Sequence, residues 1–149
     1  MPLIHADVTT EAIDFEALRA MVDDPRAGAT LHFVGQIRDH DPEAHGQVVS
    51  IDYTAHPDAP QMIGPIVESV LERLDPDRDA RVAAVHRIGH LVVGDLALVV
   101  CVATPHRKLG FAVCEAVVEA IKDELPIWKQ QEEVDGRQVW SNLGLEGDA

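Results

Sequence analysis

The stretch Asp-Leu-Ala-Leu-Val-Val-Cys-Val-Ala-Thr at 95–104 decides the fold. Apolar residues occupy both its odd-numbered and its even-numbered positions, so a strand formed here has two apolar faces. A strand of this kind lies inside a sheet and is covered on both sides. We therefore expect Cys101 to be a small buried hydrophobic side chain. Helix-spaced apolar residues follow at 111–125, and Pro126 ends that helix.

The remaining elements follow from the spacing of apolar residues on either side of this strand. Residues 81–91 have a strand pattern, and we expect them to pair with 95–104 through a connection at 93–95. Strands and helices interleave without a strict strand–helix–strand repeat, so the predicted class is α+β. The other predicted elements are helices at 12–22 and 58–74, strands at 29–37, 49–54 and 137–140, and a charged loop at 39–46.

The chain is acidic and has the size of one domain. Its 149 residues include 12 Lys and Arg against 26 Asp and Glu, a formal charge of −14, and 46% are hydrophobic. We expect one domain over 1–149, with an N-terminal segment at 1–28 and a flexible tail at 141–149. The negative charge argues against nucleic acid, and the sequence shows neither a membrane-spanning run nor a secretory signal. With two cysteines only, we expect a reduced, cytoplasmic protein.

Because the chain is so acidic, its few cations are informative by position. A buried strand is expected to end and a helix to begin at 104–108, and this junction carries His106, Arg107 and Lys108. Free backbone N–H groups and the positive end of the helix dipole favour an anion there. Arg107 could hold a phosphate through two parallel hydrogen bonds. The alternative is a solvated basic helix start.

Two more cationic positions are candidates for chemistry. Lys122 lies at the edge of the apolar stripe of its helix, and the proline after that helix can turn Lys129 back over the same cleft. Paired cations among apolar residues suit acid, base or nucleophilic chemistry. The alternative is a helix end that carries a favourable cation. Arg38 ends the first strand of 29–37, where a binding role competes with an exposed ion pair to Asp39 or Asp41.

The eight histidines do not have the spacing of a metal site. His86 and His90 are four residues apart with Gly89 between them, and no acidic residue stands at a ligand spacing. A metal-dependent enzyme that uses these two histidines and His106 is therefore only an alternative, and we expect neither a metal nor a cofactor. The sequence has no nucleophile elbow, no phosphate-binding P-loop and no dinucleotide-binding glycine pattern.

Four segments occur in a recognisable order: Phe33–Arg38, His86–Leu91 with Gly94-Asp95, Thr104–Phe111, and Lys122 through Pro126-Ile127-Trp128-Lys129. Together they resemble the catalytic (large) subunit family of molybdopterin synthase, over roughly residues 28–140. The resemblance implies an α/β-hammerhead fold with an added antiparallel β subdomain. It also implies a sulfurtransferase of molybdenum cofactor biosynthesis, which turns cyclic pyranopterin monophosphate into molybdopterin by installing a dithiolene.

The same resemblance implies partners and site residues. The sulfur would arrive as a thiocarboxylate on the C-terminal Gly-Gly of a small ubiquitin-like subunit. The large subunits would form a homodimer within a heterotetramer, and some pocket residues would come from the second copy. Catalysis would fall to Lys122 and Lys129. The residues implied to bind the substrate are Gln36, Ile37, Arg38, His106, Arg107, Lys122, Lys129, Gln130 and Gln131.

Two positions depart from the family pattern. Family members often have a basic residue and then a Glu directly after the second lysine, where this chain has Gln130-Gln131 before Glu132-Glu133. They also often have a basic residue where Gln36 stands. A non-catalytic anion-binding or scaffold subunit that retains the fold is thus the alternative. The main hypothesis requires the amines of Lys122 and Lys129 to share one cavity.

Overall fold

The strand predicted at 95–104 forms the inner part of a four-stranded sheet in the computed structural model, which describes residues 2–40, 46–134, 136 and 138–141. In chain order the elements are β1 (Leu3–Thr9), α1 (Phe15–Met21), β2 (Ala29–Gln36), β3 (Val48–Ala55), α2 (Ala59–Leu74), β4 (Arg81–Arg87), β5 (Gly89–Val92), β6 (Leu96–Thr104), α3 (Arg107–Glu124), β7 (Ile127–Glu133) and β8 (Gln138–Ser141). The mixture of three helices and two sheets confirms the α+β class.

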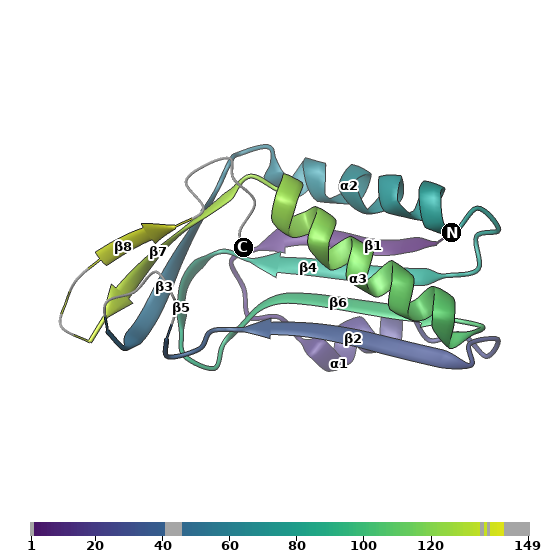
Figure 1. Cartoon of the computed structure of the whole chain (residues 1–149), viewed down its shortest axis with the longest axis horizontal. Helices are drawn as coiled ribbons and strands as arrows, with labels where there is room; N and C mark the ends of the chain where they lie inside the picture. Colours follow the sequence, from purple (N-terminus) through teal and green to yellow (C-terminus); the bar gives the residue numbers. More distant parts are fainter. Residues whose placement is uncertain (1, 41–45, 135, 137, 142–149) are drawn as a thin grey trace.

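The first sheet has the order β1-β4-β6-β2, with β1 parallel to β4 and the other pairs antiparallel (Figure 1). Helices α2 and α3 pack on one face, where Val100 and Val102 join the main hydrophobic core. Helix α1 covers the other face, above Val99 and Cys101. Both faces of β6 are therefore buried, as its sequence pattern predicts, and Cys101 is fully buried.

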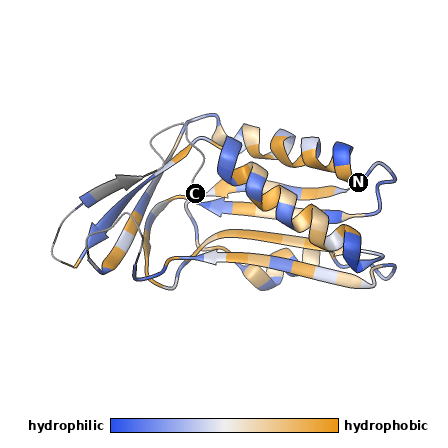
Figure 2. Ribbon diagram, in the orientation of Figure 1, coloured by the Kyte–Doolittle hydropathy of each residue, from blue (hydrophilic) through white to orange (hydrophobic). Residues whose placement is uncertain are grey.

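The second sheet, β5-β3-β7-β8, is antiparallel and lies at one end of the first (Figure 1). Its strands are more hydrophilic than those of the first sheet (Figure 2). The prediction of one continuous strand over 81–91 is wrong. Gly89 adopts a φ of 98°, a value that favours glycine, and the chain leaves the first sheet there. As a result β4 pairs with β6, whereas β5 pairs with β3 in the second sheet.

The structure differs from the sequence analysis in three further points. Strands β1 and β7 were not predicted from the sequence. In β3 the alternation of Val49, Ile51 and Tyr53 with polar residues predicts that Val49 faces inward. Val49 is instead exposed and Ser50 is buried, because the pairing with β7 shifts register between Val48 and Ser50. Phe111 was expected on the buried stripe of its helix but is 63% exposed.

Two predicted flexible segments fall largely outside the described residues. Of the loop at 39–46, positions 41–45 are not described. Of the tail at 141–149, Ser141 ends β8 and the rest is not described. Within the part of the chain that is described, no helix is both long enough and apolar enough to cross a membrane.

Candidate functional site

Lys122 and Lys129 come from different elements and line the same cavity. Lys122 occupies the last turn of α3, and Lys129 lies in β7. Helix α3 stops at Glu124 because Leu125 turns to an extended backbone ahead of Pro126, and the chain then enters the second sheet as β7. The cavity has a volume of about 40 Å³ and is lined by Tyr53, His86, Ile121, Lys122, Leu125, Ile127 and Lys129.

The cavity is cationic, and its lining contains no carboxylate among the described residues. Lys122 forms no ion pair with any described residue. Tyr53 lies directly opposite Lys129 in the pairing of β3 with β7, so both side chains project from the same face of the second sheet. An anionic group that entered this cavity would meet two amines within a partly apolar wall.

The imidazole of His86 is also part of this cavity, a placement that sequence reasoning missed. Its Nδ1 lies 2.8 Å from the carbonyl oxygen of Arg87, and its ring packs edge-on against Tyr53 with centroids 5.2 Å apart. Burial lowers the pKa of His86 to about 4, and the positive charge of Lys122 adds to this lowering. The ring is therefore neutral at physiological pH. The only signal in the sequence was its position at the end of a buried strand.

The histidines do not form a metal site in the described part of the chain. No group of three or more His, Cys, Asp or Glu side chains there could hold an ion. His86 lies in β4 of the first sheet, whereas His90 lies in β5 of the second sheet and has its Nδ1 2.9 Å from a carboxylate oxygen of Asp52. The break at Gly89 thus separates two residues that sequence spacing had placed together.

His106 and Arg107 lie at the opposite end of α3 from the lysine cavity. His106 is the N-cap residue of the helix, Arg107 is its first residue, and both are exposed. The hydroxyl of Thr104 donates a hydrogen bond of 2.7 Å to the His106 carbonyl and fixes this junction. Fifteen residues of helix separate Arg107 from Lys122, a rise of about 22 Å. Within one chain, therefore, these two groups of predicted site residues do not meet.

The residues at the end of β2 fall into two environments. Ile37 is buried, and its backbone N–H and C=O bond to Asp95 and Gly94 at 2.9 and 2.8 Å, so its side chain serves the core. Gln36 and Arg38 are exposed beside it. The carboxylate of Asp39 contacts the side chains of His40 and Gln47. Strand β2 ends toward the second sheet, which puts Arg38 at the same end of the molecule as Lys122 (Figure 1).

The two glutamines after Lys129 point to opposite faces of β7. The amide nitrogen of Gln130 donates a hydrogen bond of 3.0 Å to the Gln138 side chain. Gln131 is fully buried on the same face as Lys129, opposite Ile51, and neither atom of its amide has a partner among the described residues. Only Gln131 thus lies on the cavity side of the strand.

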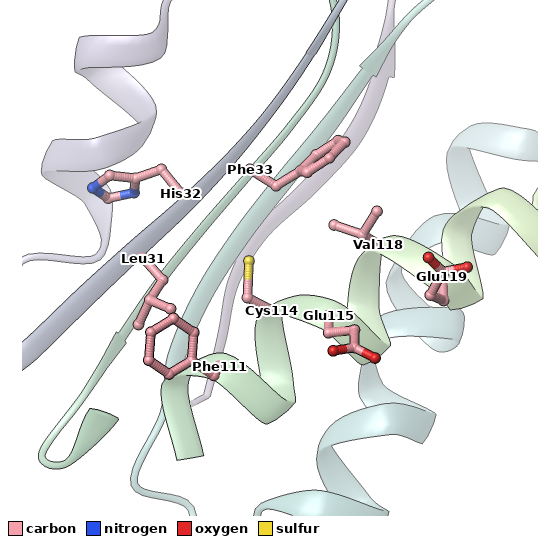
Figure 3. Close-up of a pocket in the computed structure, with 8 residues that line it drawn as sticks. All are labelled: Leu31, His32, Phe33, Phe111, Cys114, Glu115, Val118 and Glu119. Carbon is pink, nitrogen blue, oxygen red and sulfur yellow. The ribbon is translucent and has the colours of Figure 1, made fainter. Parts of the chain in front are cut away.

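A larger apolar groove runs between β2 and α3 (Figure 3). Its volume is about 440 Å³, and its lining is Leu31, His32, Phe33, Phe111, Cys114, Glu115, Val118 and Glu119. Phe111, which the sequence pattern places in the core, instead lies exposed in the wall of this groove. Burial raises the pKa of the Cys114 thiol, so that side chain behaves as a hydrophobic lining group.

The fold and this site define an α+β domain with a lysine-lined cavity where its two sheets meet. A family model described as "MoaE protein" matches residues 8–124, and the chain belongs to that family. Molybdopterin synthase catalytic subunit 1 of Mycobacterium tuberculosis is 32% identical over 127 residues, covering 85% of this chain and 84% of the relative. The molybdopterin synthase catalytic subunit of Bacillus subtilis is 34% identical over 145 residues, covering 96% and 88%.

A solved structure gives the same result for the fold. Molybdopterin synthase from Staphylococcus aureus superposes with a TM-score of 0.80 at 28% identity, covering 91% of this chain and 96% of that one. The resemblance deduced from the four ordered segments is thereby confirmed, together with the fold that it implied.

Proposed function

We propose that this chain is the catalytic subunit of a molybdopterin synthase. It transfers sulfur from the C-terminal thiocarboxylate of a small ubiquitin-like partner subunit to cyclic pyranopterin monophosphate, and two such transfers form the dithiolene of molybdopterin. The observation that carries this proposal is the shared cavity of Lys122 and Lys129 in a chain that carries 26 acidic residues. The names of the curated relatives support it, because each is called a catalytic subunit of this enzyme.

Lys122 stabilises the acyl end of the sulfur donor in this proposal. Once the sulfur has bonded to the pterin, water adds to the acyl carbon, the carbon–sulfur bond breaks and the partner leaves as a carboxylate. Negative charge builds on the acyl oxygen during this step, and an ammonium group held in a partly apolar cavity stabilises it. Lys122 also supplies or accepts the proton that is transferred when water adds to the acyl carbon. Lys129, on the facing strand, orients the pterin and maintains the positive field.

The phosphate of the substrate requires cations beyond the two lysines. Arg38 lies at the correct end of the molecule, but His106 and Arg107 of the same chain are about 22 Å from Lys122 along the helix. We therefore propose a homodimer in which a second copy supplies His106 and Arg107 to each site. The apolar groove with its exposed Phe111 flanks that end of α3 and is the surface we assign to the contact.

Three glutamines and Ile37 complete the proposed substrate site. Gln36 is exposed beside Arg38, and Gln130 contributes through the backbone of β7, since its side chain bonds to Gln138. Gln131 offers a buried amide on the same face as Lys129. Ile37 holds the strand end in place through its backbone bonds. The whole chain acts here as one large-subunit domain.

The replacement Lys122→Ala tests the proposal. With thiocarboxylated partner and pterin substrate, we expect product formation to fall by at least about 100-fold, as for loss of one oxyanion-stabilising group, while the complex with the partner still forms. The matched control is Arg73→Ala, since Arg73 is the basic residue in the last turn of the neighbouring helix α2. Full activity of Lys122→Ala would refute the assigned role. Absence of product from the unmodified chain would support a scaffold subunit instead.

A further inference from the structure

The lysine cavity has a shortage of hydrogen-bond acceptors. A lysine ammonium carries three N–H donors on a flexible four-carbon chain, so acceptors must fix its direction. Of the seven lining residues, none has a carboxylate, and the side-chain groups with lone pairs available to an ammonium are the phenol of Tyr53 and the imidazole of His86. For Lys122, which forms no ion pair with a described residue, these two rings are the side-chain acceptors that the lining offers.

The imidazole of His86 is held in one orientation and one tautomer. Because a carbonyl oxygen only accepts, the Nδ1 of His86 must carry the hydrogen of its 2.8 Å bond to Arg87. The edge-on contact with Tyr53, at an interplanar angle of 80°, fixes the ring from a second direction. In the neutral ring Nε2 then carries the lone pair. His86 is the next-to-last residue of β4 and pairs with Leu98 of β6, so an inner part of the sheet supports it.

We propose that His86 is a positioning residue for Lys122: its Nε2 accepts a hydrogen bond from the Lys122 ammonium and directs that amine into the cavity. The inference rests on the proposed role of Lys122 for its effect on the reaction, but the contact itself does not. The two side chains line one cavity, and the positive charge of Lys122 lies close enough to the imidazole to contribute to the lowering of its pKa. A charged imidazole could not accept such a bond, and burial keeps this one neutral.

Two substitutions separate the acceptor from the shape of the ring. His86→Phe keeps a ring against Tyr53 and removes both nitrogens, whereas His86→Gln restores an acceptor on a chain that reaches the position of Nε2. With thiocarboxylated partner and pterin substrate, we expect His86→Phe to lower kcat by about 10- to 100-fold, the effect of one lost hydrogen bond to a charged group, with KM nearly unchanged. His86→Gln should recover most of kcat. The matched control is His90→Gln, which changes an exposed histidine of the second sheet and should leave kcat unaltered.

Nitrogen-15 spectra of the histidines in the full chain test the contact without any reaction. We expect a pyrrole-type signal for Nδ1 of His86 and a pyridine-type signal for Nε2. The Nε2 signal should shift in Lys122→Ala and not in Lys108→Ala, whose lysine lies at the other end of α3. A hydrogen on Nε2, or an unchanged Nε2 signal in Lys122→Ala, overturns the proposal. Equal losses of kcat in the Phe and Gln variants also overturn it, because a restored acceptor would then recover nothing.

The spectra and the kinetics also separate this proposal from the function on which it rests. Full activity of Lys122→Ala together with a shifted Nε2 signal would remove the catalytic role of Lys122 and leave the hydrogen bond in place. Loss of activity in Lys122→Ala with normal kcat in His86→Phe would do the reverse, leaving the function and removing the positioning role.

Discussion

The separation of Arg107 from Lys122 leads to a quantitative prediction about mixed dimers. The two residues stand at opposite ends of α3, about 22 Å apart along the helix, which is more than one small substrate and two side chains can bridge. If a second copy supplies Arg107, each site combines Lys122 of one chain with Arg107 of the other. A dimer of one Lys122→Ala chain and one Arg107→Ala chain then has one site with both defects and one intact site.

The magnitude follows from this geometry. Each variant alone should be nearly inactive, since loss of a charge-assisted phosphate contact costs about 10- to 100-fold and loss of the catalytic amine costs more. The mixed dimer should show about half of wild-type turnover, because the symmetry of a dimer leaves one of its two sites complete. The assay is product formation by a mixed dimer that carries two different affinity tags and is purified through both.

The matched control pairs two defects within the same cavity. A mixed dimer of Lys122→Ala and Lys129→Ala chains should stay inactive, because both lysines line the cavity of a single chain and neither site is intact. Recovery in this control, or no recovery with Arg107→Ala, would refute the assignment of Arg107 to the neighbouring chain.

Two predictions concern stability. The pKa of His86 is lowered from 6.5 to about 4 in the folded protein. As the pH falls, the imidazole therefore becomes protonated in the unfolded chain before it does in the folded protein. Protonation of His86 should lower the free energy of unfolding by about 3 kcal/mol between pH 6.5 and 4. Denaturant titrations at several pH values should show that His86→Phe lacks this part of the pH dependence. If the free energy of unfolding depended on pH equally in wild type and variant, the prediction would be contradicted. Asp75→Ala should cost about 3 kcal/mol, because the buried Asp75 carboxylate accepts backbone bonds of 2.8 and 3.0 Å from Asp79 and Ala80. The exposed Asp77→Ala should change unfolding by less than about 0.5 kcal/mol, and similar midpoints for the two variants would refute this account.

The inner elements of the fold could be predicted because their burial leaves a periodic pattern. Strand β6 is apolar on both faces, and α2 has a continuous apolar stripe that ends in buried Leu71, so each pattern has one simple structural solution. The path of the chain between the sheets had no such pattern. The positive φ of Gly89 decides where the chain leaves the first sheet for the second. A glycine within a strand pattern is compatible with a bulge as well as with such a change of sheet, so the sequence alone does not settle the path.

The candidate site could be predicted in part for the same reason. The spacing of Lys122 and Lys129 around Pro126 suggested a return over one cleft, and the structure brings both amines to one cavity. The place of His86 in this cavity was missed, because the tautomer that its proposed role needs is fixed by a backbone carbonyl, which no side-chain pattern records. Phe111 was misplaced because helical spacing cannot tell the stripe that faces the core from an adjoining stripe that borders an open groove.

The most direct test of the central claim is zero-length coupling of the partner's C-terminal carboxylate to this chain, followed by mass spectrometry of the joined peptides. The chain has only three lysines, Lys108, Lys122 and Lys129, so the products are few. If the partner tail enters the cavity, the new amide joins it to Lys122 or Lys129, although Lys108 is also exposed. Coupling to Lys108 alone would place the tail at the other end of α3 and contradict the proposed site.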